Sequence, residues 1–355
     1  MQTAPAREFP QAAVILITAA CFVVIVAGMK ASADILVPFF LAVFIAIIFT
    51  PPLFWMQRKK VPTAIAIVFI IACMVAIGYL LARFVGGSIN DFTNTLPVYR
   101  ELLIEKTAGL QQWLNKLGIE VTDKMLRTHL NPGVAMQMAG KTLTALGGVL
   151  TNAFLILLTV IFILFEAAGF PDKVRSALKA PEKSLSSFGL FTESVNRYLA
   201  LKTILSVLTG LLVWLWLAVL GVDYALLWGL VAFIFNYIPN IGSIIAAVPA
   251  VLLALVQLSL LHTILTAAGY LVINAGIGNL VEPRLMGGRL GLSTLVVFLS
   301  LVFWGWVLGP VGMLLSVPLT MILKIALASN EETLWLALML GKDASEAREM
   351  GEAGA

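Results

Sequence analysis

The stretch Tyr224–Val281 reads YALLWGLVAFIFNYIPNIGSIIAAVPAVLLALVQLSLLHTILTAAGYLVINAGIGNLV. It contains no aspartate, glutamate, lysine or arginine, and a single histidine, His262, interrupts the apolar run. A helix that crosses the hydrocarbon core of a bilayer needs about 20 apolar residues. The stretch is therefore long enough for more than two crossings, and it indicates an integral membrane protein.

The composition of the whole chain supports this class. Hydrophobic residues make up 60% of the 355 residues and charged residues 12%, whereas a soluble protein is roughly half apolar and a quarter charged. A water-soluble core cannot hide that much apolar surface, so the surplus is expected to face lipid. The net charge of +4 comes from scattered basic residues, a pattern that argues against a nucleic-acid partner.

Further runs without charged side chains predict the remaining helices. Five runs each have the length of one crossing, and a last run, Leu290–Leu323, is too long for one crossing and short for two. We therefore predict an all-α polytopic fold with about five full transmembrane helices and two shorter hairpins in the C-terminal half. The five runs are Gln11–Met29, Ile35–Gln57, Val61–Ala82, Thr142–Phe165 and Thr203–Val222.

Lysine and arginine in the loops set the predicted orientation, because cytoplasmic loops carry an excess of both. The basic loops fall on one side if both termini are cytoplasmic. The predicted regions are a three-helix membrane region (1–83), an extracytoplasmic amphipathic segment (84–145), a membrane transport core (146–330) and a cytoplasmic tail (331–355). The basic loop residues are Arg58, Lys59, Lys60, Lys173, Arg175, Lys179, Lys183, Arg197, Lys202, Arg284, Arg289 and Lys324.

The segment Arg83–Lys141 differs from the runs because it is polar. Apolar residues recur at helical spacing from Ile89 to Leu117, which predicts an amphipathic helix with a break near Pro97 and Gly109. A turn signal at 131–133 predicts a second short helix after it. The segment is expected to lie on the membrane surface or against a partner subunit; a folded loop without a site of its own is the alternative.

No motif in the chain predicts an enzyme, a cofactor or a metal site. Residues 135–142, AMQMAGKT, resemble a phosphate-binding loop. They lack the preceding strand that such a loop requires and lead straight into a membrane span. His129 and His262 are too few for a histidine metal site, and no nucleophile stands with a matching base.

Two motifs interrupt the long apolar runs of the C-terminal half. Proline removes a backbone donor, and glycine permits tight turns. Because irregular backbone at membrane depth is tolerated only where protein or water satisfies it, each run is predicted to form a helix–break–helix hairpin that does not cross fully. The motifs are Asn236-Tyr-Ile-Pro239-Asn240-Ile-Gly242 and Leu308-Gly309-Pro310-Val-Gly312, followed by Val248-Pro249 and Val317-Pro318 respectively.

The two hairpins also resemble each other. Gly221 precedes Gly242 by 21 positions, and Gly291 precedes Gly312 by the same number. A single helix over His262–Val281 separates them, so they should point in opposite directions. Paired broken segments in repeated halves are a sequence pointer to a transporter's binding site; the alternative is a set of proline kinks without function.

The few polar residues near the breaks are the candidate transport-path residues. Asn279 and Glu282 are three apart and are expected to share a helix face, which Pro283 should end or kink. Polar groups inside a membrane are costly and often functional, although Glu282 could equally form a surface pair with Arg284 or Arg289. Glu166 is expected as an interfacial charge. The full set is Asn236, Pro239, Asn240, Gly242, Asn279, Glu282, Pro283, Arg284, Pro310, Gly312 and Pro318.

These motifs together resemble the autoinducer-2 exporter (AI-2E) family. The resemblance rests on Asn236–Gly242, Asn279-x-x-Glu282-Pro283-x-x-x-Gly287, Gly309-Pro310-x-Gly312 and Val317-Pro318, and the layout of spans is similar along essentially the whole chain. It implies a homo-oligomeric transporter of the bacterial inner membrane that exports autoinducer-2 or another small polar solute. Other members of the family look like sodium- or lithium-proton antiporters.

The residues themselves favour the exporter over the antiporter. A cation antiporter needs a titrating carboxylate at membrane depth, and the charge-free runs of the C-terminal half hold none. We therefore predict export of a small neutral or anionic solute, with lipid as the surrounding partner. A non-transporting oligomeric scaffold, suggested by the amphipathic segment, and a channel are the further alternatives.

Overall fold

The computed structural model describes residues 11–116, 152–177, 181–239, 241–286, 292–328, 330 and 332–341. Within those ranges the regular structure is helical and no β-strand occurs. Helices satisfy their own backbone hydrogen bonds, which lipid cannot do for them. The all-α prediction is confirmed for the described residues.

Three apolar helices open the described chain, as predicted. α1 (Gln11–Ala31) and α2 (Ala33–Arg58) meet at Ser32. A tight turn in which Lys60 has a positive φ of 62° leads into α3 (Thr63–Lys116). Across this turn the amide of Gln57 donates to Oγ1 of Thr63 at 3.1 Å, so α2 and α3 run in opposite directions.

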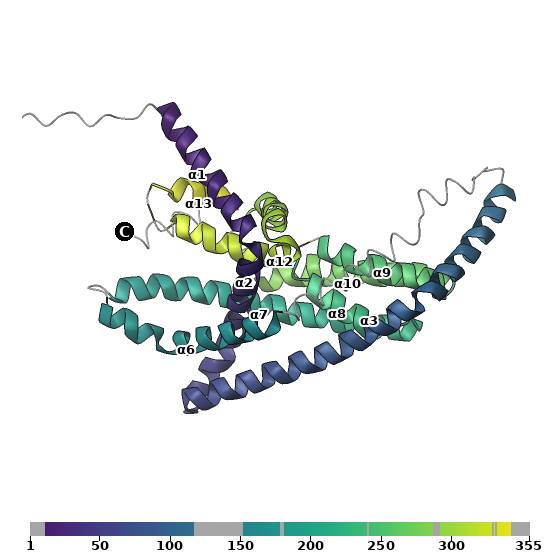
Figure 1. Ribbon diagram of the computed structural model, residues 1–355, viewed down its shortest axis with the longest axis horizontal. Helices are drawn as coiled ribbons and strands as arrows, with labels where there is room; N and C mark the ends of the chain where they lie inside the picture. The colour runs from purple at the N-terminus through teal and green to yellow at the C-terminus, as the bar shows by residue number, and fades with distance from the viewer. Residues whose placement is uncertain are drawn as a thin grey trace, which may run out of the picture.

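Helix α3 continues far beyond its apolar part. It is one helix of 54 residues, and Figure 1 shows its C-terminal end projecting past α9. The predicted break near Pro97 and Gly109 is therefore wrong. Pro97 is exposed, so the carbonyl that its missing N–H leaves unpaired can be satisfied outside the helix, which need not end there. The predicted turn at 131–133, the helix after it and residues 135–142 lie outside the described residues.

The C-terminal half begins with the long α6 and α7, continues with the shorter α8 to α11, and ends with the long, kinked α12 and the short α13. The long α6 and α7 pack together, and α8, α9 and α10 gather beside the C-terminal part of α7. The elements are α6 (Ala153–Ala177), α7 (Pro181–Leu220), α8 (Ala225–Phe235), α9 (Ile241–Gln257), α10 (Leu260–Asn274), the π-helical segment η1 (Ala275–Val281), α11 (Glu282–Met286), α12 (Thr294–Ala328) and α13 (Leu334–Leu340).

Five described helical stretches are long and apolar enough to cross a membrane, which indicates a multi-pass protein. Three match predicted single crossings, and a fourth, Leu260–Leu285, contains the predicted helix between the hairpins. The predicted first and fourth crossings correspond to shorter described apolar stretches, Leu16–Ala31 and Ala153–Ala167. The five are Ala33–Arg58, Thr63–Phe92, Val195–Leu220, Leu260–Leu285 and Thr294–Ala328.

The first predicted hairpin is formed by α8 and α9. The helix stops at Phe235 and resumes at Ile241, as the proline and asparagine residues between them predicted. A Cβ added to Gly242 would overlap the carbonyl oxygen of Phe235, so the two arms approach backbone to backbone. At the open end of the hairpin, Oε1 of Gln257, the last residue of α9, accepts a hydrogen bond from the backbone N–H of Asp223 at 3.0 Å.

The second predicted hairpin lies within α12. Gly309 has φ 69° and ψ −154°, which breaks the helix. The indole N–H of Trp304 donates to Oγ1 of Thr320 at 3.0 Å, although 16 residues of straight helix would separate the two by about 24 Å. The chain therefore folds back at Gly309, while Pro318 remains inside the helical second arm.

The glycines of the two hairpins have the same packing role. A Cβ on Gly242 would meet Cβ of Ile238, and a Cβ on Gly312 would meet Cβ of Leu308, in each case four residues earlier. Gly312 also lies against the carbonyl of Trp304 in the opposite arm, as Gly242 lies against that of Phe235. This shared geometry supports the predicted repeat.

The contacts at their ends place the two hairpins in opposite directions. Near the second break, the ammonium of Lys30, in the last turn of α1 just before α2, lies 4.0 Å from the ring centroid of Trp306. The open end of the first hairpin lies at Asp223, which accepts a hydrogen bond from Tyr99 in the far part of α3. Because α3 runs antiparallel to α2, this open end and Lys30 share one side of the bundle.

Candidate functional site

Helix α7 carries a line of polar side chains on one face. Tyr198, Lys202, Ser206 and Thr209 are spaced four, four and three residues apart, so they lie above one another along the helix. All four are buried, Lys202 to 3% and Ser206 to 0% exposure. Buried polar groups in an apolar helix are expensive unless they are paired. We call these four residues the polar face of α7.

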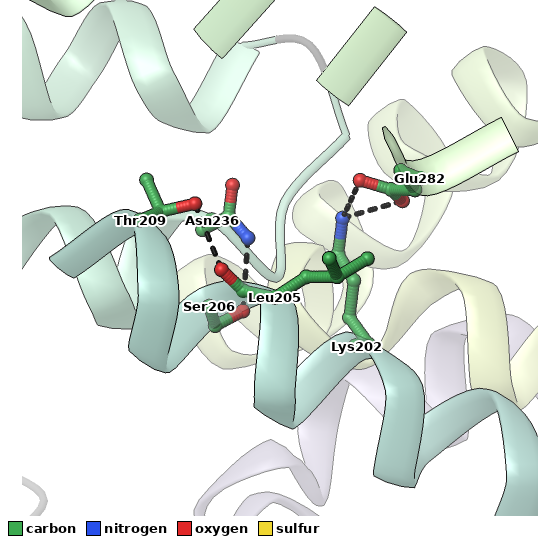
Figure 2. Close-up of polar contacts among 6 residues, drawn as sticks. All are labelled: Lys202, Leu205, Ser206, Thr209, Asn236 and Glu282. Carbon is green, nitrogen blue, oxygen red and sulfur yellow. Dashed lines mark hydrogen bonds and ion pairs between the residues drawn. The ribbon is translucent and has the colours of Figure 1, made fainter. Parts of the chain in front are cut away.

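The strongest interaction on the polar face is an ion pair. The ammonium of Lys202 lies 2.7 Å from Oε1 and 2.9 Å from Oε2 of Glu282, with side-chain exposures of 4% and 20%. Figure 2 shows both contacts, with Glu282 reaching down from the start of α11. A second ion pair, between Lys173 and Glu166, is well exposed, at 66% and 57%. The side chains of the Lys202–Glu282 pair are therefore much less exposed than those of the Lys173–Glu166 pair.

Two predictions about these charges need correction. Lys202 was assigned to a basic loop, but it lies within α7 and is buried. Glu282 pairs with Lys202 rather than with Arg284, which is exposed; Arg289 lies outside the described residues. The reason is tertiary, since α11 packs against α7 and brings together charges 80 positions apart. In the sequence, the signal that could have identified Lys202 is its position directly before the apolar run Thr203–Val222.

The tip of the first hairpin meets the same face of α7. The amide of Asn236 donates to Oγ of Ser206 at 2.9 Å, and the hydroxyl of Tyr237 donates to Oγ1 of Thr203 at 2.8 Å. Figure 2 shows Asn236 beside Ser206, which lies about one turn along α7 from Lys202 and the ion pair. The ring of Phe44 in α2 packs edge-on against Tyr237, with centroids 5.6 Å apart. The break predicted from proline and asparagine therefore lies beside buried polar groups.

The winding before Glu282 departs from the prediction. Residues Ala275–Val281 are π-helical, and the backbone N–H of Glu282 bonds to the carbonyl of Ile277, five residues back. Glu282 is half-buried against α7 whereas Asn279 is exposed, so the predicted shared face of the two is wrong. Pro283, also exposed, does not end the helix, which continues to Met286.

The remaining predicted residues divide between two places. At the first hairpin, Pro239 is half-buried and Gly242 buried; Asn240 lies outside the described residues. At the second hairpin, Gly312 and Pro318 are buried and Pro310 is exposed. The second arm around Pro318 packs in the same core cluster as Tyr198 and Tyr237, whereas the first arm near the break packs against α1 and α2. The structure therefore brings the second arm, not the second break, to the polar face.

A separate polar contact lies just after the C-terminal end of α7. The hydroxyl of Tyr99 in α3 donates to Oδ2 of Asp223 at 2.7 Å, and the ring of Phe92 packs edge-on against Tyr224 and Trp228. Burial of the phenol, with the Asp223 hydrogen bond as the second cause, raises the pKa of Tyr99. The long extension of α3 is thereby fixed to the junction of α7 and α8.

The chemistry of the polar face suits binding rather than catalysis. Together with Glu282 and Asn236, which contact it, the polar face offers an ammonium, a carboxylate, an amide and hydroxyls within a few helical turns. These groups can hold a small polar molecule by hydrogen bonds. Among the described residues there is no group of three histidine, cysteine, aspartate or glutamate side chains that could hold a metal ion.

Comparison with known proteins identifies the family. The profile of the AI-2E family transporters matches residues 19–331. The chain belongs to the AI-2E transporter family. The AI-2 transport protein TqsA of Escherichia coli (strain K12) is 44% identical over 326 residues, covering 92% of this chain and 95% of TqsA. Two putative transport proteins are also similar: YhhT of the same strain, 40% identical over 334 residues (94% and 96% coverage), and one from Haemophilus influenzae, 39% identical over 332 residues (92% and 95% coverage).

This AI-2E family member is therefore a multi-pass membrane transporter and not an enzyme. The family resemblance seen in the motifs is confirmed. The alternative of a non-transporting scaffold is not supported, because the family is one of transporters. Autoinducer-2 transport is what the name of TqsA states for that relative.

Proposed function

We propose that this transporter exports a small polar solute, autoinducer-2 or a related metabolite, along the polar face of α7. The observation that carries the proposal is the buried Lys202–Glu282 pair beside the Asn236–Ser206 contact. The substrate name comes from TqsA, which is similar along nearly the whole chain.

Energetics support a functional role for the pair. Removing two charges from water costs several kcal/mol per ion, and a well-packed apolar pair is often as stable or more stable. A buried pair is therefore poorly explained by stability alone, and intramembrane charges commonly belong to solute pathways. The amide and hydroxyls next to it extend the polar surface along α7.

The two opposed hairpins support a transport core of the kind built from inverted repeats. We propose that both are re-entrant membrane hairpins, with the first tip and the second arm of α12 meeting at the polar face. In such transporters, one part of the protein moves against another around a site near the middle of the bilayer. The regions 1–83, 84–145, 146–330 and 331–355 remain our proposed division, with 84–145 extracytoplasmic.

The setting follows from the basic loops and from the family. We propose a bacterial inner-membrane location with both termini cytoplasmic, because the basic loops then lie inside. We also propose a homo-oligomer, as the family resemblance implies. Cysteine labelling from each side of sealed vesicles tests the orientation.

Flux measurements test the proposed function. Liposomes that contain the purified protein and are loaded with autoinducer-2 should release it faster than loaded liposomes without protein. The double substitution Lys202→Met with Glu282→Gln should reduce this rate at least about tenfold, a change that one lost charged contact can account for. The exposed pair supplies the matched control, Lys173→Met with Glu166→Gln, which should transport normally. Equal release rates from loaded liposomes with and without the wild-type protein would reject this solute. Normal flux in the Lys202–Glu282 double variant would reject this path.

A sodium- or lithium-proton antiporter is the second candidate, favoured by one observation. Glu282 is a partly buried carboxylate whose partner is a single ammonium, and a metal cation could take the place of that ammonium. Proteoliposomes with an internal pH dye would show cation-dependent proton movement that Glu282→Gln abolishes. Such movement without autoinducer-2 flux would favour the antiporter over the exporter.

A further inference from the structure

A π-helical segment, η1, leads directly into the ion pair. η1 is π-helical over seven residues, whereas π turns are rare and usually occur singly at functional sites. The next residue is Glu282 itself. α10, which precedes η1, is fixed to α7, because the indole N–H of Trp216 donates to the carbonyl of Leu265 at 3.0 Å.

The winding of η1 decides which side chain faces α7. Ile277 is buried in the cluster beside α7. An α-helix turns by about 100° per residue, so regular winding would place Val281 above Ile277 and turn Glu282 away by roughly 140°. In π winding the residue five positions on takes that place instead. Accordingly, Val281 is exposed and Glu282 reaches Lys202.

Two features favour the π form. Pro283 has no N–H, and in a regular helix its ring would clash with the carbonyl four residues earlier, that of Asn279. The ion pair to Lys202 adds an attraction that regular winding would lose. Both features act on the backbone immediately before α11.

Two glycines in the same segment disfavour regular α winding. A Cβ at Gly276 or Gly278 would meet nothing within 4 Å, so packing within the protomer does not require glycine there. By contrast, Gly269 in α10 lies against the ring of Trp216, which a Cβ would overlap. Glycine weakens the interior of an α-helix, so Gly276 and Gly278 disfavour the α form of η1 and help it to keep the π winding.

We propose that η1 is a hinge that positions Glu282, and that its rewinding to α-helix withdraws Glu282 from Lys202 during transport. Because α10 is held by Trp216, rewinding turns the residues after α10 and leaves α10 in place. The released ammonium of Lys202 is then available to an oxygen of the solute. The inference deepens the proposed function and rests on it for the link to transport.

A labelling experiment reads the winding without any solute. Val281→Cys is introduced into a chain whose native thiols are removed by Cys21→Ser and Cys73→Ser, and the rate of modification by N-ethylmaleimide is measured in nanodiscs. Position 281 is exposed in the π form and turns towards α7 in the α form, so rewinding slows labelling. The double variant Gly276→Ala with Gly278→Ala, called the glycine variant below, should favour the α form by up to about fivefold per site, an upper limit set by the helix preference of alanine over glycine.

Matched substitutions separate the hinge from general effects. Pro283→Ala should slow labelling as the glycine variant does, because it permits regular winding. Gly28→Ala with Gly78→Ala is the control, since these helical glycines also have open space around them, and it should leave the rate unchanged. Unchanged labelling in both the glycine variant and Pro283→Ala would overturn the hinge, and so would equal slowing in the control.

Transport and size measurements complete the test. Slower labelling together with slower autoinducer-2 efflux in the glycine variant supports the hinge as a step of transport, whereas slower labelling with normal efflux overturns that link. A changed oligomer mass in the glycine variant would assign the glycines to subunit packing and also overturn it. If the wild type moves no autoinducer-2, the proposed solute fails while the labelling result still decides the winding.

Discussion

Removing one partner of the buried ion pair should destabilise the transporter, and the two single substitutions should differ. Glu282→Gln leaves the ammonium of Lys202 unpaired with only 4% of its side chain exposed, whereas Lys202→Met leaves a carboxylate that keeps 20%. An uncompensated buried charge costs about 3–5 kcal/mol. We expect about 3 kcal/mol for Glu282→Gln and about half of that for Lys202→Met, because the exposed part of the carboxylate remains solvated.

The double variant provides the internal test of this reasoning. Lys202→Met with Glu282→Gln removes both charges, and replacing a buried pair by uncharged side chains is often nearly neutral. It should therefore be more stable than the Glu282→Gln variant alone and lie within about 1 kcal/mol of the wild type. A double-mutant cycle then gives the coupling energy of the pair.

Thermal unfolding in detergent micelles measures these differences. For a chain of this length, 1 kcal/mol corresponds to roughly 1–2 °C in Tm, so Glu282→Gln should lower Tm by roughly 4 °C. Glu166→Gln is the control, because the pair of Glu166 with Lys173 is exposed and such pairs contribute about 0–1 kcal/mol. The reasoning is refuted if Glu282→Gln unfolds within about 1 °C of the wild type, or if the double variant is no more stable than Glu282→Gln.

Two further predictions concern the hairpins and the far end of α7. Gly242→Ala and Gly312→Ala should each cost about 3 kcal/mol or more, because the new methyl overlaps a backbone carbonyl of the opposite arm; wild-type Tm and membrane yield in both would contradict this close contact. Tyr99→Phe should cost about 1.5 kcal/mol by removing the hydrogen bond to Asp223. Because the pKa of Tyr99 is raised in the folded protein, its contribution is complete below about pH 10 and is lost as pH rises further. A wild-type advantage in Tm that stays constant from about pH 9 to 12 would refute this linkage.

Most of the architecture could be predicted because it rests on local properties. The breaks at Asn236–Pro239 and at Gly309 follow from residues that lack a backbone donor or tolerate a positive φ, and the structure has both breaks. Pro97 shows the limit of this reasoning. A proline on an exposed helix face does not have to end the helix, and exposure is a property of the folded chain.

The candidate site could be predicted only in part. Asn236 and Glu282 were found from their place near breaks, and both lie at the polar face of α7. Lys202 and Ser206 were missed, because a residue at the edge of an apolar run looks like a loop residue until its neighbours are known. Asn279 was expected beside Glu282 on the basis of α-helical geometry, which η1 does not have.

The membrane class, the approximate number of apolar helices, the two hairpin breaks and the family resemblance all follow from the sequence without tertiary information. Hydropathy, missing N–H groups and backbone freedom are properties of single residues or short windows, so they can be read along the chain. Which charges meet, and how the chain before Glu282 is wound, depend on the packing of distant helices. Lys202 and Glu282 are 80 positions apart and meet because α11 packs on α7, and the π winding persists where this attraction and Pro283 act together.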